Sequence, residues 1–262
     1  MEKQDIQSFI NKVICGECIS VMKGIPDKSV DMILTSPPYD NLRDYNGYTF
    51  NFEGIAKEIY RVLKNGGVVV WVVGDATIKG SETGTSFKQA LYFKEIGFNL
   101  HDTMIYEKTN PMPKNSNRYE SCFEYMFVLS KGKPNTVNLI KEKTKMFGKI
   151  NSGTYYKTDG TLIKKSGSGK PYKEYKTIKN IWQYPVGREM VKGHPAIFPE
   201  KLAEDHILSW SNEGDIILDP MAGSGTTLKM AKKNNRNYIG IEISAEYIDI
   251  INKRLTQDTN PK

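Results

Sequence analysis

Short apolar runs alternate along the chain with segments whose apolar residues recur at helical spacing. Such continuous runs are typical of strands that are buried on both faces of a parallel sheet. They occur at Lys12–Cys15, Ser29–Leu34, Val68–Val73, Met104–Tyr106, Tyr125–Leu129, Asp215–Leu218 and Tyr238–Ile243. Helical spacing predicts helices over Phe52–Leu63, ending at Asn65-Gly66-Gly67, and over Phe87–Ile96. This alternation predicts a doubly wound α/β sheet.

The patterning lapses in the middle of the chain, where positive charge is concentrated. The formal net charge is +7, but Lys141 to Lys192 alone contain 13 Lys/Arg against 4 Asp/Glu, so the remainder is slightly acidic. Glycine-, serine- and lysine-rich segments at Lys149–Tyr156 and Lys164–Lys170 predict loops, mobile without a partner. Lysines would neutralise phosphates, and nearby aromatic and arginine side chains would contact bases. Those side chains are Tyr155, Tyr156, Tyr172, Tyr175, Trp182 and Arg188. A solvated linker is the alternative.

A strand, a glycine turn and a helix follow one another near the C-terminal end. The turn is Asp219-Pro220-Met221-Ala222-Gly223-Ser224-Gly225-Thr226-Thr227. Glycines permit positive φ and close approach of a ligand, while the following helix directs free N–H groups at the turn. A dinucleotide-binding motif would have a third glycine where this chain has Leu228, and a phosphate-binding loop would have a lysine where it has Thr226. Both of these phosphate-binding interpretations are therefore weakened. Glu242, near the end of the next strand, could accept hydrogen bonds from ribose hydroxyls. The segment predicts a nucleotide-like cofactor, with an ordinary tight turn as the alternative.

Two consecutive prolines stop an early strand at Ser36-Pro37-Pro38-Tyr39. Proline cannot continue a ladder, so Ser36 and Tyr39 are expected at the carboxyl edge of the sheet, where open α/β sheets bind ligands. The Ser36 hydroxyl and the Pro37 carbonyl suit an exocyclic base amine, whose lone pair is otherwise delocalised into the ring. Hydrogen bonds to these acceptors would favour a tetrahedral nitrogen, positioned for direct attack on a methyl donor. Tyr39 offers a face on which a flipped-out base can stack; the alternative is a stiff loop in which Tyr39 only packs.

These two motifs resemble those of the DNA amino-methyltransferases, which modify cytosine N4 or adenine N6 with S-adenosylmethionine as methyl donor. In that family the Pro-Pro motif is catalytic and the glycine motif binds the cofactor. Their order here is similar to the circularly permuted beta group. The resemblance implies a permuted Rossmann-like methyltransferase fold with a catalytic part at 1–135, an inserted target-recognition region at 136–190 and a cofactor-binding part at 191–262. It implies double-stranded DNA as partner, and leaves open a cognate restriction endonuclease and a homodimer.

The same resemblance assigns roles to further positions. His194–Leu202 looks like the family motif upstream of the glycine turn, in which Phe198 and Pro199 would enclose the methionine portion of the cofactor. Glu17 matches an acidic residue near the adenine, although aspartate is commoner there. Asp219 matches the residue that meets the donor's amino group, and Thr35 is assigned to the cofactor site with them.

Ser36 bears on the target base. Family members with Ser-Pro-Pro-Tyr are mostly cytosine-N4 enzymes, whereas adenine-N6 enzymes usually carry Asp-Pro-Pro-Tyr. Cytosine is therefore favoured and adenine is the alternative. Two further hypotheses are a catalytically silent DNA-binding protein and methylation of RNA or protein, for which the motif usually begins with asparagine.

The cysteines and the termini exclude other classes. Methylation at carbon five of cytosine needs a thiolate after a proline, but none of Cys15, Cys18 and Cys122 follows one. A Cys15–Cys18 metal or redox pair is disfavoured, because only 3 histidines are present to complete a metal shell. No apolar leader and no run of about 20 apolar residues is present, so we expect a cytoplasmic protein without a membrane anchor.

Overall fold

The computed structural model describes residues 4–38, 50–111, 113, 117–187 and 199–257, and divides into two units. The larger unit comprises Met1–Asn138 and Asn180–Lys262, and the smaller one comprises Leu139–Lys179. Within the described ranges, no helix is long and apolar enough to cross a lipid bilayer.

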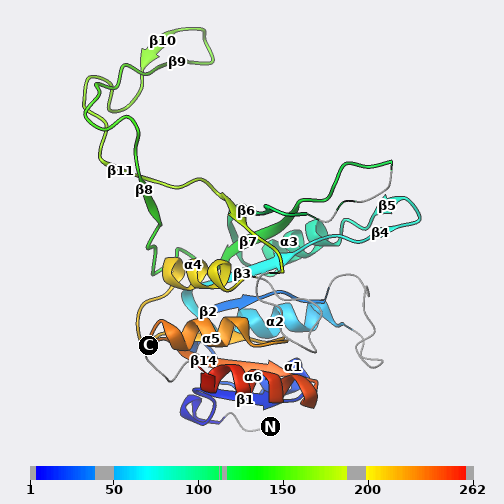
Figure 1. Cartoon of the computed structure of the whole chain (residues 1–262). Coiled ribbons are helices and arrows are strands. Elements are labelled where there is room, and N and C mark those ends of the chain that lie inside the picture. The colour runs from blue at the N-terminus through cyan, green and yellow to red at the C-terminus, as the bar shows by residue number, and fades with distance from the viewer. Residues whose placement is uncertain (1–3, 39–49, 112, 114–116, 188–198, 258–262) are drawn as a thin grey trace. The chain divides into compact units, whose positions relative to one another are not determined.

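An eight-stranded mixed sheet forms the centre of the larger unit and confirms the predicted α/β class. In spatial order its strands are β1 (Lys12–Cys15), β14 (Asn237–Glu242), β13 (Ile216–Asp219), β2 (Val30–Thr35), β3 (Leu63–Val73), β7 (Phe123–Ser130), β6 (Asn99–Lys108) and β12 (Ile181–Tyr184). The first five are parallel, β7 is antiparallel to both of its neighbours, and β12 is parallel to β6. The blue β1 lies beside the orange β14, so the two ends of the chain meet within one sheet (Figure 1).

The pairing of β2 with β13 joins the N-terminal and C-terminal halves. Met32 is the register partner of Ile217, and Ile33 that of Leu218. All four side chains are fully buried, as expected for central strands of a parallel sheet. Because the pairing is parallel, both strands end at the same edge.

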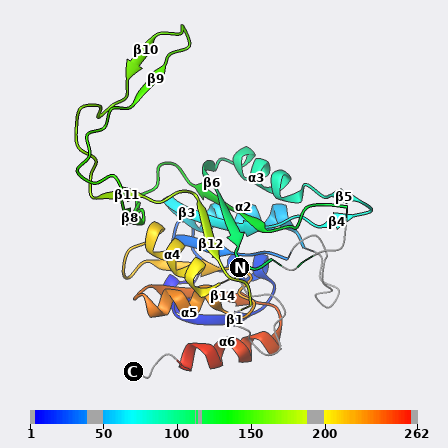
Figure 2. The ribbon, with the colours of Figure 1, turned by 45° about the horizontal axis from the view of Figure 1, so that its top comes forward.

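Helices cover both faces of this sheet. One group contains η1 (Ile6–Ser8), α1 (Cys18–Met22), α2 (Phe52–Val62) and α3 (Thr85–Glu95). The other contains α4 (Glu200–Trp210), α5 (Thr226–Lys233) and α6 (Ala245–Gln257). In both views α4 lies next to α5 (Figures 1 and 2). Side chains alternate between faces along each strand, so Val69, Trp71 and Val73 enter the core shared with α1–α3, while Val68 and Val70 point to the opposite face.

One predicted boundary differs from the structure. The helix α2 ends at Val62, and β3 begins directly at Leu63 rather than after the glycines. Leu63 pairs with Val30, and an irregularity in the register then carries the strand through Gly66, at φ +79°, to the regular ladder. The Asn65-Gly66-Gly67 signal therefore marks a distorted part of the strand, in which Gly66 N–H donates to the Lys131 carbonyl and the Gly67 carbonyl accepts from Lys131 N–H.

The smaller unit contains short strands, and those of one pair overlap the segments predicted as loops. β8 (Lys141–Lys143) pairs antiparallel with β11 (Tyr175–Thr177), and β9 (Thr154–Tyr156) pairs antiparallel with β10 (Leu162–Lys164). A further small ladder, β4 (Thr77–Ile78) with β5 (Ser81–Glu82), belongs to the larger unit. The periodicity of such short, exposed strands is too brief to be detected in a glycine- and lysine-rich sequence.

The prediction that Trp182 contacts bases is wrong for this structure. Trp182 and Tyr184 lie in β12, each only 8% exposed. The Trp182 ring packs on His206 of α4, with centroids 4.6 Å apart, and the Tyr184 hydroxyl donates to Asp205 at 2.8 Å. Burial lowers the pKa of His206 to about 3, so this ring is neutral. These aromatic residues extend the core, and Arg188 lies outside the described residues.

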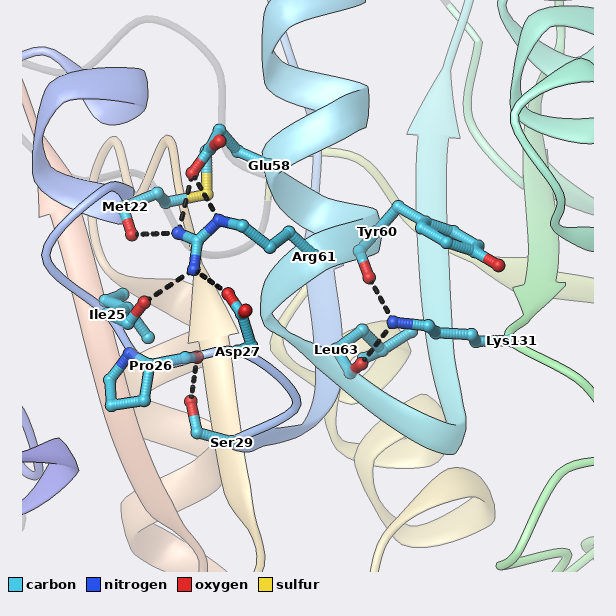
Figure 3. A network of polar contacts seen from close by, with 10 residues as sticks. All are labelled: Met22, Ile25, Pro26, Asp27, Ser29, Glu58, Tyr60, Arg61, Leu63 and Lys131. Atoms are coloured by element: carbon cyan, nitrogen blue, oxygen red, sulfur yellow. Dashed lines mark hydrogen bonds and ion pairs between the residues drawn. The ribbon is translucent and has the colours of Figure 1, made fainter. Parts of the chain in front are cut away.

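Arg61, at the end of α2, forms a network of hydrogen bonds next to the amino ends of β2 and β3 (Figure 3). Its guanidinium donates to the carbonyls of Met22 and Ile25 and to the carboxylates of Glu58 and Asp27, at 2.6 to 3.1 Å. The side chain is 23% exposed, and it links the loop before β2 to α2. This arrangement stabilises the edge of the sheet opposite to the one where β2 and β13 end.

We therefore expect Arg61→Met to lower the free energy of unfolding by about 2 kcal/mol, because two buried carbonyls and Glu58 lose a charged donor. Asp27 is half-exposed, so its ion pair adds little. Urea unfolding followed by circular dichroism measures the change. Lys57→Met, on an exposed position of the same helix, is the control and should shift stability by less than about 0.5 kcal/mol. Equal stability of the two variants would contradict the role of Arg61.

Candidate active site at the carboxyl edge of the sheet

The two motifs meet where β2 and β13 end. β2 runs to Thr35, and Ser36-Pro37-Pro38 leaves the sheet directly after it. Thr35 is fully buried, Pro37 is buried, and Ser36 is half-buried. β13 ends at Asp219, 2% exposed, immediately before Pro220 and the glycine turn. Tyr39 lies outside the described residues, so its stacking role stays a prediction.

The glycine turn adopts the conformation that its sequence predicts. Gly223 and Gly225 have φ values of +53° and +79°, where a residue with a Cβ is strained. A Cβ on Gly225 would also lie 2.8 Å from Cγ2 of Ile251. A rotamer change of that side chain would not easily relieve this clash, because its Cβ is also within 3.3 Å. Ala222 N–H donates to the carbonyl of Ile241 at 2.9 Å and ties the turn to β14. Helix α5 then begins at Thr226 with no side-chain cap, which leaves N–H groups at its start available to a ligand.

Glu242, at the end of β14, braces the turn from the neighbouring strand. One carboxylate oxygen accepts from Gly223 N–H at 2.7 Å, and the other accepts from Ser244 N–H at 2.9 Å. Burial raises the pKa of the carboxyl, and the backbone hydrogen bonds oppose that shift. A carboxylate has about four lone-pair sites and these backbone contacts do not use all of them, so acceptance of a ribose hydroxyl stays chemically available.

Asp219 is the most buried acid of this edge. Burial raises the pKa of its carboxyl to about 6, while the Thr35 and Thr227 hydroxyls and the Met221 N–H, 3.2 Å from Oδ1, favour the ionised form. The charge of Glu242 adds to the rise. No cation of a described residue contributes to this pKa, and a buried carboxylate suits a positively charged ligand group.

Thr35 also fits a ligand group next to the Asp219 carboxylate. Its hydroxyl lies close enough to Asp219 to lower that pKa, yet Thr35 Oγ1 is buried without a well-directed hydrogen bond. Thr227 Oγ1 donates to the carbonyl of Leu34 at 3.2 Å, so it fastens α5 to β2. The residues at this edge therefore fit a cofactor that carries an ammonium group and a ribose.

Glu17 also reaches this edge, because Cys15 is the register partner of Glu242 and Gly16 N–H donates to the Glu242 carbonyl at 2.9 Å. The Glu17 carboxylate caps α1, accepting from Ile19 N–H at 2.9 Å and Ser20 N–H at 2.8 Å. Burial opposes ionisation of Glu17, but these hydrogen bonds outweigh it and lower the pKa. A contact with the cofactor adenine remains a prediction for this residue.

Other predicted residues are placed only in part. Pro199 is buried and precedes α4 as its N-cap residue, while Phe198 lies outside the described residues. Asp75, two residues after the end of β3, accepts from Ser86 N–H at 2.9 Å and so holds the start of α3. Among the residues that the structure describes, no cluster of His, Cys, Asp and Glu could hold a metal ion.

Arg254, near the end of α6 and only 7% exposed, belongs to no motif recognised in the sequence. Its guanidinium donates to the Ser224 carbonyl at 2.6 Å and to Thr226 Oγ1 at 3.2 Å. An arginine in the last turn of an amphipathic helix carries no local signal, since cations are common there for their interaction with the helix dipole. Only the packing of α6 against the turn identifies it.

Comparison with known proteins gives a family and several close matches. A family model described as DNA methylase matches residues 30–253. The orphan methyltransferase M.BamHII of Bacillus amyloliquefaciens is 59% identical over 242 residues, which cover 89% of this chain and 91% of that protein.

Two solved structures share the fold. The complex of M1.HpyAVI with S-adenosylmethionine has a TM-score of 0.64 at 26% identity, and the match covers 93% of this chain and 98% of that one. The PvuII DNA methyltransferase, titled cytosine-N4-specific, has a TM-score of 0.69 at 19% identity and covers 95% and 88%. The predicted Rossmann-like methyltransferase fold is therefore confirmed.

The raised pKa of Asp219 predicts how stability depends on pH. Because the native state holds this proton up to pH 6 and the unfolded chain releases it near 3.8, stability falls as pH rises between these values and the penalty is complete above them. We expect Asp219→Asn to gain stability relative to the wild type between pH 4 and pH 7.5, by up to about 3 kcal/mol.

Urea unfolding at the two pH values measures this difference. Asp249→Asn, on an exposed position of α6, is the matched control for the loss of one carboxyl group. If Asp219→Asn and wild type differ by the same amount at both pH values, the carboxyl does not titrate as stated.

Proposed function

The chain belongs to the DNA methylase family of amino-methyltransferases, and on that premise we propose that it methylates cytosine N4 in double-stranded DNA. The observation that carries the proposal is the parallel pairing of β2 with β13, which brings Ser36-Pro37-Pro38 and Asp219 to one edge of the sheet. A donor and an acceptor of a methyl group must meet within contact distance, and this edge supplies a site for each.

The cofactor is S-adenosylmethionine, which supplies an electrophilic methyl group when bound. We assign Asp219, with Thr35 and Thr227 beside it, to the ammonium group of the cofactor. Glu242 would accept from the ribose, Glu17 would contact the adenine, and Phe198 with Pro199 would enclose the methionine portion. The turn from Pro220 to Gly225 gives the backbone approach that these contacts require.

The Pro-Pro segment holds the target amine. The exocyclic amine would donate to the Ser36 hydroxyl and to the Pro37 carbonyl, which would leave the nitrogen lone pair available to bond to the methyl carbon. The carbon–sulfur bond of S-adenosylmethionine would break, S-adenosylhomocysteine would leave as a neutral thioether, and the nitrogen would lose one proton. Burial of Pro37 and the fixed φ of both prolines keep these acceptors in place before the base arrives. Tyr39 stacks on the flipped base, and no covalent intermediate with the protein forms.

Ser36 supports cytosine as the target base. A serine at this position resembles the cytosine-N4 enzymes of the family, and adenine N6 remains the second candidate because a hydroxyl can accept from either amine. The PvuII enzyme carries the cytosine-N4 description, but its 19% identity to this chain shows the fold alone.

The smaller unit, Leu139–Lys179, is our candidate for reading the DNA sequence. It contains 11 Lys/Arg and 3 Asp/Glu, and exposes Tyr155 at 47% and Tyr156 at 71% on β9. Exposed lysines beside exposed aromatic rings suit phosphates and bases, respectively. The related M.BamHII is named an orphan methyltransferase; a cognate endonuclease, a homodimer and a cytoplasmic location stay predictions for this chain.

Mass spectrometry of nucleosides tests the target base. Unmodified duplex DNA of varied sequence is incubated with the protein and S-adenosylmethionine labelled in its methyl group, then digested to nucleosides. We expect label in N4-methylcytosine. Label in N6-methyladenine would overturn the cytosine assignment and keep the family. Absence of label in DNA, with the cofactor bound, would overturn the proposed substrate.

Ser36→Ala separates catalysis from cofactor binding. We expect kcat to fall by about 10²-fold, because the target amine loses an acceptor in the transition state, while the Kd for S-adenosylmethionine changes by less than about twofold. Ser29→Ala is the matched control, since Ser29 precedes the opposite end of the same strand and donates to the Pro26 carbonyl at 2.7 Å. A folded Ser36→Ala protein that no longer binds the cofactor would contradict the assigned role.

A further inference from the structure

Arg254 contacts the glycine turn from outside it. Its Nη1 atom donates to the Ser224 carbonyl at 2.6 Å, to Ser224 Oγ at 2.9 Å and to Thr226 Oγ1 at 3.2 Å. These acceptors lie on both sides of Gly225, whose φ of +79° defines the shape of the turn. The turn's own side chains provide no helix cap for α5, so this contact from α6 restrains a segment that glycines make conformationally free.

Glu200 fixes the guanidinium from the other side. Its Oε1 atom accepts from Arg254 Nη2 at 2.7 Å and from Lys229 Nζ at 2.8 Å. Burial opposes ionisation of Glu200, but Lys229 and Arg254 outweigh it and lower the pKa, so the carboxylate stays charged. One acid on α4 thus binds cations from α5 and α6.

This network joins two segments assigned to the cofactor. Glu200 follows Pro199, which is expected to enclose the methionine portion, and Arg254 holds the turn from Ser224 to Thr226. The Arg254 guanidinium contacts both segments. Its Nη1 atom donates to the turn, and its Nη2 atom donates to Glu200. Arg254 therefore links the two walls of the cofactor site from behind the turn, in addition to the ion pair between Lys229 and Glu200.

We infer that Arg254 is a positioning residue for S-adenosylmethionine, which holds the glycine turn in its binding conformation, and that Glu200 orients it. The inference rests on the proposed use of this turn by the cofactor. Arg254 acts through Ser224 and Thr226, so its removal should affect cofactor binding more than the methyl-transfer step.

The test compares Arg254→Met, Arg254→Lys and wild type by calorimetric titration with S-adenosylmethionine and by steady-state kinetics on DNA. Arg254→Met should raise both the Kd and the KM for the cofactor at least about tenfold, the loss expected for a charge-assisted hydrogen bond, while kcat changes less than about threefold. Arg254→Lys keeps the charge but can contact either the turn or Glu200, not both. Its Kd for S-adenosylmethionine should therefore lie between that of Arg254→Met and that of the wild type.

Arg61→Met is the control for a purely structural effect. Arg61 also binds backbone carbonyls and carboxylates, but at the opposite edge of the sheet, so its loss should lower stability and leave the cofactor Kd unchanged. Glu200→Gln extends the test. It should weaken binding alone, yet add less than about twofold when combined with Arg254→Met, because Glu200 acts through the arginine.

The outcomes separate this inference from the proposed function. If the wild type fails to bind S-adenosylmethionine, the proposed function fails first. If the wild type binds and the folded Arg254→Met or Arg254→Lys protein binds equally well, the positioning role is overturned. If Arg254→Met does not fold, an unchanged Kd in both Arg254→Lys and Glu200→Gln overturns it in the same way.

Discussion

The parallel pairing of β2 with β13 is the interaction that brings the two functional motifs together. Ile216 N–H donates to Asp31 Oδ2 at 2.9 Å, across a sequence separation of 185 residues. Closing so long a loop costs conformational entropy, although that cost grows only slowly with length. Burial of Met32, Ile33, Ile217 and Leu218 offsets it. Without this pairing the Pro-Pro segment and the glycine turn would be two unrelated loops. With it, strand direction alone brings them to one edge.

Stabilising contacts lie at the amino edge of the sheet, and the residues assigned to function lie at the carboxyl edge. At the amino edge Arg61 satisfies carbonyls and carboxylates, and Lys131 donates to the carbonyls of Tyr60 and Leu63 at the end of α2. At the carboxyl edge Asp219 and Glu242 are buried with raised pKa values. Buried acids lower stability, so a fold that retains them needs favourable interactions elsewhere. The Arg61 network provides such interactions at the amino edge.

Sequence patterning predicted the central strands well, because each is a continuous apolar run that only a doubly covered sheet can bury. It failed at β12, where Trp182 and Tyr184 alternate with exposed Ile181 and Gln183 within four residues. Such a short strand at the end of a basic stretch is indistinguishable from an aromatic-rich loop. It also failed at Arg254, since long-range contacts to Ser224 and Thr226 leave no trace in local sequence.

Local chemistry was sufficient to find both motifs: two prolines stop a strand wherever it lies, and glycines at 223 and 225 permit a turn that other residues resist. Patterning was also sufficient for the fold class, and the family came from the resemblance of the two motifs to those of the DNA amino-methyltransferases. The packing of distant segments supplied the rest. It raised the pKa of Asp219 by burial, set Glu242 against Gly223 and brought Arg254 behind the turn. Burial and long-range hydrogen bonds are properties of neighbours in space, and a linear sequence does not contain those neighbours until the chain has folded.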